Sequence, residues 1–299
     1  GAGCIASKWA KFMQQLGLED RKRALRLVNG MKHYDLLLKD QSGNDFSIPQ
    51  DYFVTEWIDN DVDNFFYDSN NYGTNTKISL FRSIVLALQT IHSEGLFHRD
   101  LKIDNIRLKA SDPEFLSIII DFGTAASIDS ENLKSPYTSP VGAPAFAAPE
   151  CFVGLAADRS SCQRSDLYSL GTLLFDLFAI HPFHIARSQQ TSFDAIIWAI
   201  QQRIAGAGSV EAKLAIWAEC MRDFRYRTDG PEFGAAGARI PPSILPILST
   251  VYECLTKFDF QERDPCFKKL IARVDSALKI HNNEDRYQKK LKLRRQQRQ

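Results

Sequence analysis

The sequence has 299 residues, of which 44% are hydrophobic and 11% aromatic, and its formal net charge is +1. This composition suits one large domain or two lobes around a sizeable core, and it excludes a disordered chain. The near-neutral charge selects neither nucleic acid nor a membrane surface as a partner, and no apolar run is long enough to span a bilayer. Six scattered cysteines, together with the lack of a secretory signal pattern, indicate reduced thiols in a cytoplasmic protein rather than disulfides or a zinc site.

The first thirty residues predict helical structure. Apolar side chains recur at the i, i+3, i+4 and i+7 spacing of an amphipathic helix that Ser7 would cap, which makes Lys8 an exposed residue of its first turn. These apolar side chains are Trp9, Phe12, Met13 and Leu16. A further helix is expected over residues 21–28.

Two strands are expected next, over residues 34–38 and 52–58, with a turn at residues 41–45 between them. A helix is expected over residues 78–92, ending at Gly95, because apolar residues form a stripe along it. The stripe consists of Leu80, Ile84, Leu88 and Ile91.

Residues 59–64 have the spacing of acids that begins a calcium loop. Asn64 stands where such a loop needs Gly and Asn70 where it needs Glu, so we exclude a calcium site. The acids in this stretch are either solvated turn residues or contacts to a ribose or a basic substrate.

The residues after the predicted helix carry the chemistry. Residues 98–105 read His-Arg-Asp-Leu-Lys-Ile-Asp-Asn, and residues 121–123 read Asp-Phe-Gly. Between them, residues 115–120 form an apolar stretch that predicts a buried strand. The two motifs supply an acid, a cation, an amide and a second acid on loops at strand ends, which is the set needed to transfer a phosphoryl group with a divalent metal.

A third motif, Ala-Pro-Glu at residues 148–150, follows in order, and with it the chain resembles the eukaryotic-type serine/threonine protein kinase domain from residue 52 to 263. The resemblance implies an α+β, two-lobed fold. An abbreviated small lobe would occupy residues 1–57, a larger and mainly helical lobe residues 58–284, and a basic tail residues 285–299.

By this resemblance, Asp100 orients the substrate hydroxyl and accepts its proton, while Lys102 neutralises the γ-phosphate and indicates Ser/Thr acceptors. Asn105 and Asp121 would hold Mg²⁺ beside the phosphates of ATP, since a hard cation prefers oxygen ligands. Each of these residues, taken alone, could equally be a turn acid or part of a salt bridge.

The nucleotide contacts of the small lobe follow from the same resemblance. Thr55 would be the gatekeeper, and the backbone of Glu56 and Ile58 would hydrogen-bond the adenine. In the alternative to the N-terminal helix, residues 4–8 form a strand that is similar to the family's Val-Ala-Ile-Lys, and Lys8 contacts the nucleotide phosphates.

The partner that this family normally gives such a lysine is a Glu on the next helix. Glu19 and Asp20 are the candidates, although both are closer to Lys8 than is usual. The sequence shows no glycine-rich loop before Lys8, which is a departure from the family pattern.

The expected activation loop runs from residue 124 to 141. Its phosphorylatable residues are Ser127, Ser130, Ser135, Tyr137, Thr138 and Ser139. Arg99 either pairs with a phosphate on one of them or only braces the loop.

Residues 142–150 resemble the substrate-docking segment of the family, and we call them the docking segment. Ala143 stands where Thr is common, so a hydroxyl that would bond the catalytic acid is absent. Glu150 is expected to form a buried ion pair with Arg263. Asp166, on a helix expected to be buried over residues 165–175, would cap backbone groups of the catalytic loop.

Two further helices are expected between residues 182 and 246, around Trp198, Ile200 and Trp217, either as plain large-lobe helices or as a recognition surface. The tail is basic and is either a solvated helix end or a site for nucleic acid, an acidic protein or anionic lipid. Its basic residues are Arg286, Lys289, Lys290, Lys292, Arg294, Arg295 and Arg298.

The sequence therefore predicts an ATP- and Mg²⁺-dependent protein serine/threonine kinase that acts on a protein substrate. A pseudokinase that serves as a binding or scaffold module is the first alternative, because the glycine-rich loop is missing. A small-molecule phosphotransferase is the second, although it would not need the docking segment.

Overall fold

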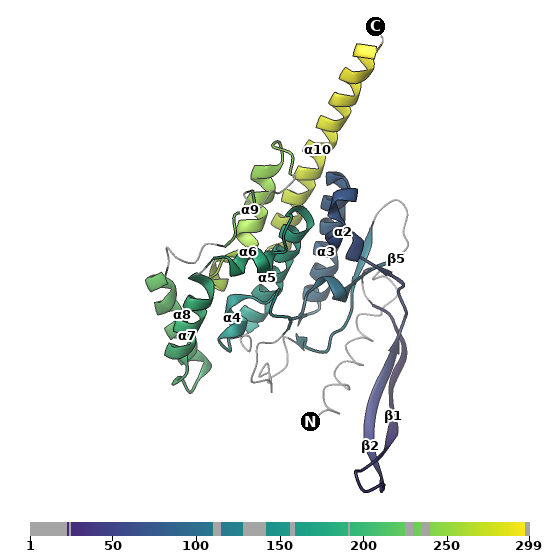
Figure 1. Ribbon diagram of the computed structural model, residues 1–299, viewed down its shortest axis with the longest axis vertical. Coiled ribbons are helices and arrows are strands. Elements are labelled where there is room, and N and C mark those ends of the chain that lie inside the picture. The colour runs from purple at the N-terminus through teal and green to yellow at the C-terminus, as the bar shows by residue number, and fades with distance from the viewer. Residues whose placement is uncertain are drawn as a thin grey trace.

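The computed structural model describes residues 23, 25–109, 115–127, 142–155, 159–190, 192–224, 230–234 and 240–296. Its fold is mixed α+β, with small sheets in the N-terminal part and helices in the C-terminal part, which confirms the expected fold class. Figure 1 shows a helical body from which a β-hairpin projects at one end and the last helix at the other.

The hairpin consists of β1 (Leu27–Lys39) and β2 (Asp45–Thr55), which pair antiparallel. The two expected strands are confirmed, but β1 begins well before residue 34 and β2 ends at Thr55 rather than at residue 58. The helix expected over residues 21–28 is wrong where it can be checked, because Leu27 pairs with Thr55 in the sheet. Residues 21, 22 and 24 lie outside the described part of the chain.

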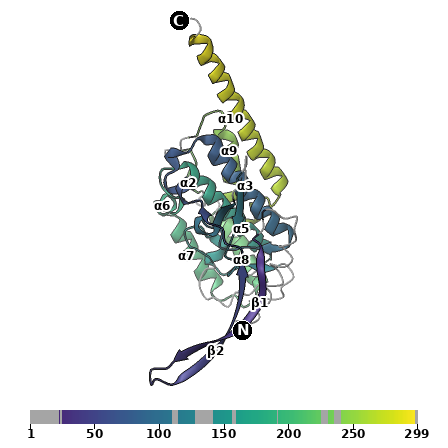
Figure 2. The same ribbon diagram turned by 90° about the vertical axis from the view of Figure 1, so that its right-hand side faces the viewer.

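The outer half of the hairpin is regular and carries apolar side chains. Leu36 lies opposite Ile48 and Leu38 opposite Phe46, so these four residues share one face of the sheet. All four are partly exposed to solvent. Figure 2 shows this end of the hairpin reaching beyond the helical body.

The body is built around four helices: α3 (Thr74–Ser93), α5 (Arg159–Phe178), α9 (Leu245–Thr256) and α10 (Phe267–Gln296). The apolar stripe expected on α3 is confirmed, since its four residues are all buried. Between residues 165 and 175, α5 is buried on nearly every side, as a helix with apolar residues all round should be.

Three helices lie between these: α6 (Phe183–Ser188), α7 (Ser192–Ile204) and α8 (Val210–Phe224). The latter two confirm the pair of helices expected here. Trp217 is fully buried and stacks on Phe258 with ring centroids 5.9 Å apart, whereas Trp198 is 63% exposed. Trp217 therefore belongs to a second core cluster, and Trp198 lies on the surface.

The remaining elements of the described chain are short. They are β3 (Asn60–Asp61), α2 (Asp63–Tyr67), η1 (Ser69–Asn71), β4 (Leu96–Phe97), η2 (Ile103–Asn105), β5 (Ile106–Lys109), β6 (Leu116–Ile119), β7 (Ala126–Ser127), α4 (Pro149–Phe152) and η3 (Phe260–Glu262). Strands β3, β5 and β6 form one sheet in that order, and β4 pairs with β7. The expected buried strand is confirmed as β6, while residues 60 and 61 form a ladder with β5 rather than a turn.

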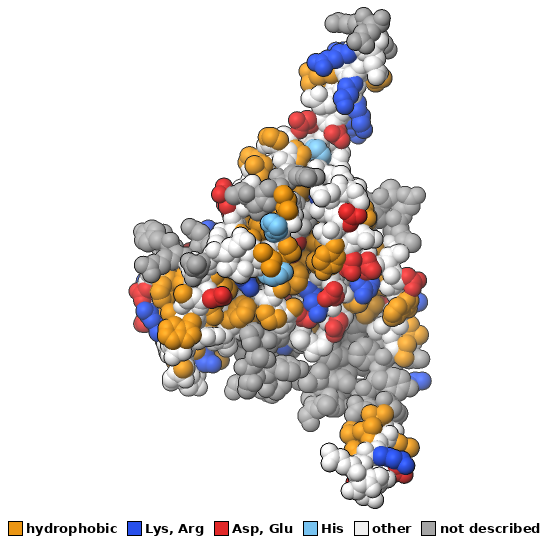
Figure 3. Space-filling view, viewed as in Figure 1, with side chains coloured by type: hydrophobic (Ala, Val, Ile, Leu, Met, Phe, Trp, Pro, Cys, Tyr) orange, Lys and Arg blue, Asp and Glu red, His pale blue; other side chains and the backbone are white. Residues whose placement is uncertain are grey.

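Helix α10 is anchored at its start and exposed at its end. Phe267, Leu270, Val274 and Ala277 are buried, and the basic residues from Arg286 onward are exposed. Figure 3 shows Lys and Arg side chains along the projecting end of this helix. Arg298 lies outside the described residues.

Two expectations about the whole chain are testable only on the described ranges. Within them, no helix combines the length and the apolar character that crossing a membrane requires. The five cysteines in these ranges are free thiols, and Cys4 lies outside them.

Candidate active site

The loop between β4 and η2 carries the His-Arg-Asp motif and is hydrogen-bonded to α5. The carboxylate of Asp166 is fully buried and accepts the backbone N–H groups of His98 and Arg99, each at 2.7 Å. This confirms the capping role predicted for Asp166. Arg99 has a positive φ of 63°, which a non-glycine residue adopts only when its surroundings hold it there.

A residue that sequence reasoning missed completes this support. His92, in the last turn of α3, places its Nε2 atom 2.9 Å from the same Asp166 carboxylate and packs edge-on against the rings of Phe97 and Phe267. Its only signal in the sequence was its place near the end of a helix that leads into the motif, which is too common a feature to distinguish it.

Asp100 has both carboxylate oxygens occupied by donors. Oδ1 accepts the backbone N–H of Ala143 at 2.7 Å, and Oδ2 lies 3.3 Å from the side-chain nitrogen of Asn105. The Nζ atom of Lys102 lies 3.8 Å from Oδ2. The structure thus brings Asp100, Lys102 and Asn105 together, as expected from their spacing.

Hydrogen bonds place Asp121 next to this group. The backbone N–H of Ile120 donates to the carbonyl oxygen of Asn105, and the carbonyl oxygen of Ile120 accepts Nε2–H of His98, both at 2.9 Å. Asp121 follows directly with a φ of 58°, and its side chain is exposed. The backbone of Asp121 therefore follows a residue that is hydrogen-bonded to the loop of Asp100 and Asn105.

The side chains at this point suit a hard divalent cation. The amide nitrogen of Asn105 donates to the carbonyl oxygen of Asp100 at 2.9 Å, which leaves its Oδ1 atom available as a ligand. Oδ1 of Asp121 accepts only a weak bond from the Gly123 N–H at 3.2 Å. An amide oxygen and a carboxylate are the donor set that Mg²⁺ takes from a protein when phosphates supply the rest.

The predicted adenine-binding segment follows β2. The backbone N–H of Glu56 donates to the carbonyl oxygen of Arg26 at 2.9 Å. Of the two backbone groups of Glu56, the carbonyl oxygen is therefore the one available to hydrogen-bond an adenine. The Glu56 carboxylate accepts Nζ of Lys109 at 2.6 Å and the N–H of Arg26 at 2.8 Å, which ties this segment to β5. Thr55 and Ile58 flank it and are partly buried.

The phosphate-contacting lysine cannot be placed. Lys8 and its candidate partners Glu19 and Asp20 lie outside the described residues, as does the amphipathic helix predicted around them. Both interpretations of residues 4–16 therefore stay predictions.

The first residues of the activation loop are fixed to the catalytic loop. Nε of Arg99 donates to the carbonyl oxygen of Thr124 at 2.6 Å, and the Thr124 hydroxyl donates to the carbonyl oxygen of His98 at 3.1 Å. Arg99 therefore does brace the loop. Ser127 pairs with Leu96 in the β4–β7 ladder, while the other phosphorylatable candidates lie outside the described residues, so pairing of Arg99 with a phosphate is untested.

The docking segment lies against Asp100. Gly142 has a φ of +87°, and a Cβ atom there would lie 2.4 Å from the carbonyl oxygen of Arg99, so only glycine fits. Ala143 lacks the hydroxyl common in the family, and its backbone N–H contacts Asp100 instead. The Ser169 hydroxyl, from α5, donates to the carbonyl oxygen of Phe146 at 2.9 Å.

The predicted ion pair at the end of this segment is confirmed. Glu150 and Arg263 are both fully buried and meet through two parallel hydrogen bonds of 2.7 and 3.0 Å. Arg263 also donates to the carbonyl oxygens of Lys257, Arg164 and Phe258. Burial raises the pKa of Glu150, and the nearby guanidinium opposes this rise.

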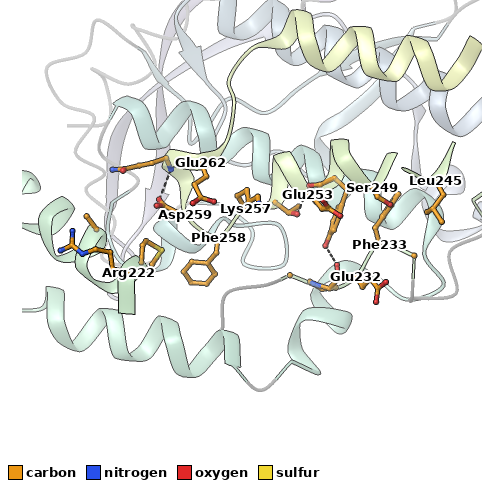
Figure 4. Close-up of a pocket in the computed structure, with 18 residues that line it drawn as sticks. Arg222, Glu232, Phe233, Leu245, Ser249, Glu253, Lys257, Phe258, Asp259 and Glu262 are labelled. Carbon is orange, nitrogen blue, oxygen red and sulfur yellow. Dashed lines mark hydrogen bonds between the residues drawn. The ribbon is translucent and has the colours of Figure 1, made fainter. Parts of the chain in front are cut away.

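A separate pocket of about 970 Å³ lies between α8, α9 and residues 230–234. Figure 4 shows charged side chains that line it, which come from several elements. These residues are Arg222, Glu232, Glu253, Lys257, Asp259 and Glu262. None of the site residues predicted from the sequence lines it.

Comparison with known proteins gives matches over most of the chain. A family model described as "Protein kinase domain" matches residues 44–261. The human 3-phosphoinositide-dependent protein kinase 1 is 37% identical over 115 residues, which is 38% of this chain and 19% of that protein. The rat dual specificity testis-specific protein kinase 2 is 25% identical over 245 residues, or 78% of this chain and 39% of that protein.

A bacterial relative, the serine/threonine-protein kinase AfsK of Streptomyces griseus, is 40% identical over 116 residues, which is 38% of this chain and 13% of that protein. The chain thus spans well under half the length of each of these curated relatives.

Proposed function

The chain belongs to the protein kinase domain family, and from this premise we propose that it transfers the γ-phosphoryl group of ATP to Ser or Thr hydroxyl groups of a protein substrate. The family supports phosphoryl transfer to proteins in general. The acceptor type, the metal and the residue roles are the finer parts of the proposal.

The proposed chemistry begins at Asp100, whose carboxylate is oriented by two N–H donors toward the site it shares with Lys102 and Asn105. It orients the acceptor hydroxyl and takes its proton as the oxygen forms a bond to the γ-phosphorus. The bond from that phosphorus to the β–γ bridging oxygen breaks, and ADP leaves. Lys102 neutralises charge on the transferred group.

When bound, Mg²⁺ would neutralise the charge of the β- and γ-phosphates. Asn105 and Asp121 are the residues that would hold it, through the free amide oxygen of the first and the exposed carboxylate of the second. The preference for Ser or Thr acceptors rests on Lys102, which resembles the pattern of serine/threonine kinases.

The observation that supports the proposal is the hydrogen-bonded connection from Asp100 through Asn105 to Ile120, the residue before Asp121. We expect radiolabelled ATP to transfer label to protein with the unaltered chain and not with Asp121→Ala. Asp223→Ala is a control, because Asp223 is an acid whose side chain is 55% exposed and which pairs with Arg203, not with a proposed site residue. Equal label with all three proteins would overturn the proposal.

A pseudokinase is the second candidate, and one observation favours it. Among the described residues before Ile58, the regular structure is limited to the two strands of the hairpin. In a pseudokinase without nucleotide binding, adding ATP with Mg²⁺ would leave the melting temperature unchanged, whereas the kinase proposal expects a rise that requires both.

The basic residues of α10 are a further proposed contact surface. An acidic partner would bind this helix less tightly as salt is added, because the exposed cations are easily screened.

A further inference from the structure

Arg187, on α6, reaches across to the docking segment. Its two terminal nitrogens donate to the carbonyl oxygen of Pro144 at 3.1 Å and to the carbonyl oxygen of Ala147 at 3.4 Å. A planar guanidinium can hold two acceptors in a fixed relation, because its donors form a rigid fork. One side chain therefore spans the middle of the docking segment.

Three aromatic rings fix the guanidinium in this position. Its central carbon lies 4.3 Å from the ring centroid of Phe193 and 5.8 Å from the centroids of Phe152 and Phe183. The rings come from α7, α4 and α6, so three separate elements surround one cation. Each such contact adds attraction between the cation and the ring. These ring contacts keep the Arg187 guanidinium in the position in which it hydrogen-bonds the docking segment.

The docking segment also contacts Ser169 of α5 and Asp100. Ser169 holds the carbonyl oxygen of Phe146, which lies between the two carbonyl groups that Arg187 binds. At the start of the segment, the Ala143 N–H donates to Asp100. Movement of the segment would therefore change both the platform for the substrate chain and the contact on the acid.

We propose that Arg187 is a positioning residue for the protein substrate: it fixes the docking segment in the conformation that receives the acceptor chain. The inference rests on the proposed kinase function. Ala143 leaves the segment without the hydroxyl that commonly ties it to the catalytic acid, and the Arg187 fork supplies a tie from the opposite side. Sequence analysis gave no sign of this role, because Arg187 lies about forty positions from the carbonyl groups it binds.

Arg203 provides a matched control. It is also an arginine on a surface helix, its guanidinium lies 5.4 Å from the ring centroid of Phe224, and it pairs with Asp223 at 2.6 Å. These contacts join α7 to α8 and do not involve the docking segment. Arg203→Ala therefore removes a similar cation–ring contact without the proposed function.

The test measures steady-state kinetics with a Ser-containing peptide. This peptide is one that the unaltered chain phosphorylates when it is screened against a peptide library. For Arg187→Ala we expect kcat/KM for the peptide to fall about tenfold, through a higher peptide KM, because two charge-assisted hydrogen bonds to the segment are lost. KM for ATP should stay within about twofold. Arg187→Lys keeps the charge but not the fork and should give a partial loss, whereas Arg203→Ala should match the unaltered chain.

Hydrogen–deuterium exchange of the docking-segment amides tests the same inference without activity. Exchange should be faster in Arg187→Ala and unchanged in Arg203→Ala. If the unaltered chain transfers no phosphate, the proposed function fails, and the exchange result alone decides the role of Arg187. Unchanged peptide KM with unchanged exchange would overturn the inference. So would an equal loss in the peptide and ATP parameters, which would indicate a general structural defect.

Discussion

Asp176, near the end of α5, makes the stability of this protein dependent on pH. Asp176 is only 9% exposed to solvent, and its carboxylate accepts a hydrogen bond from the backbone N–H of Phe183 at 2.6 Å. Burial raises its pKa from 3.8 to about 7, against the opposing effect of that hydrogen bond. The pKa of Tyr67, on α2, is raised by burial and also by the negative charge of nearby carboxylates, of which Asp176 is one.

The sign of the effect follows from proton binding. Between pH 4 and 7 the folded chain holds a proton on Asp176 that the unfolded chain releases, so stability is greatest at the acid end and falls as pH rises. A pKa change of about three units corresponds to about 4 kcal/mol. Asp176→Asn keeps an acceptor oxygen for Phe183 but cannot ionise, so it should gain up to about 4 kcal/mol over the unaltered chain near pH 8 and almost nothing near pH 4.

Urea unfolding, followed by tryptophan fluorescence from pH 4.5 to 8, measures this difference. Asp264→Asn is a control of opposite sign, because the hydrogen bond from Lys269 lowers the pKa of Asp264. Because Asp264 is ionised in both the folded and the unfolded chain across this pH range, that variant should lose an amount of stability that does not change with pH. Parallel stability curves for Asp176→Asn and the unaltered chain across this range would refute the reasoning.

Three further changes have expected outcomes. Glu150→Ala leaves the guanidinium of Arg263 buried without its carboxylate and should lower the unfolding free energy by about 3–5 kcal/mol in urea titrations; a change below about 1 kcal/mol would contradict this. Gly171→Ala places a Cβ atom 2.6 Å from Thr256, between α5 and α9. Overpacking of about 1–3 kcal/mol outweighs a helix-propensity gain of about 1 kcal/mol, so its melting temperature should fall rather than rise. Chelation of divalent metal by EDTA should abolish the melting-temperature increase that ATP produces, and excess Mg²⁺ should restore it; an increase that persists in EDTA would count against the proposed metal site.

The catalytic motif was predictable because its residues are close in sequence and the loop between them is short. Asp100, Lys102 and Asn105 lie within six positions, so their meeting needs only local geometry. Asp121 needed one further inference, that residues 115–120 form a buried strand, and the apolar run there indicated this directly. The backbone hydrogen bond from Ile120 to Asn105 then places the residue before Asp121 beside the loop of Asp100.

The hairpin was predicted only in part, because residues 34–38 cover one stretch of β1 and residues 52–55 cover only the end of β2. The register shifts between Leu27 and Asn29 and between Asn29 and Lys32, so the alternation of side chains that marks a strand is broken there. Residues 21–28 then read as a helix, because their local propensity favours one, and pairing with Thr55 overrides that preference. A two-residue strand such as β3 is too short to leave any pattern.

Long-range contacts escaped prediction unless a family motif pointed to them. The Glu150–Arg263 pair spans 113 positions and was predicted because both residues fall in recognisable motifs. Arg187 and His92 make contacts that span 40 to 74 positions, but neither stands in a motif. Nothing in their neighbouring residues distinguishes them from other surface or helix-end cations.

The central claim is that Asp100 acts on the acceptor hydroxyl while other residues hold the nucleotide. The most direct test is the rate of phosphoryl transfer by Asp100→Asn at saturating ATP and Mg²⁺, with the affinity for ATP measured on the same samples. Loss of the proton acceptor should lower the rate by about 10²–10⁴-fold, with ATP affinity changed by less than about threefold. Transfer by Asp100→Asn at the rate of the unaltered chain would contradict the claim.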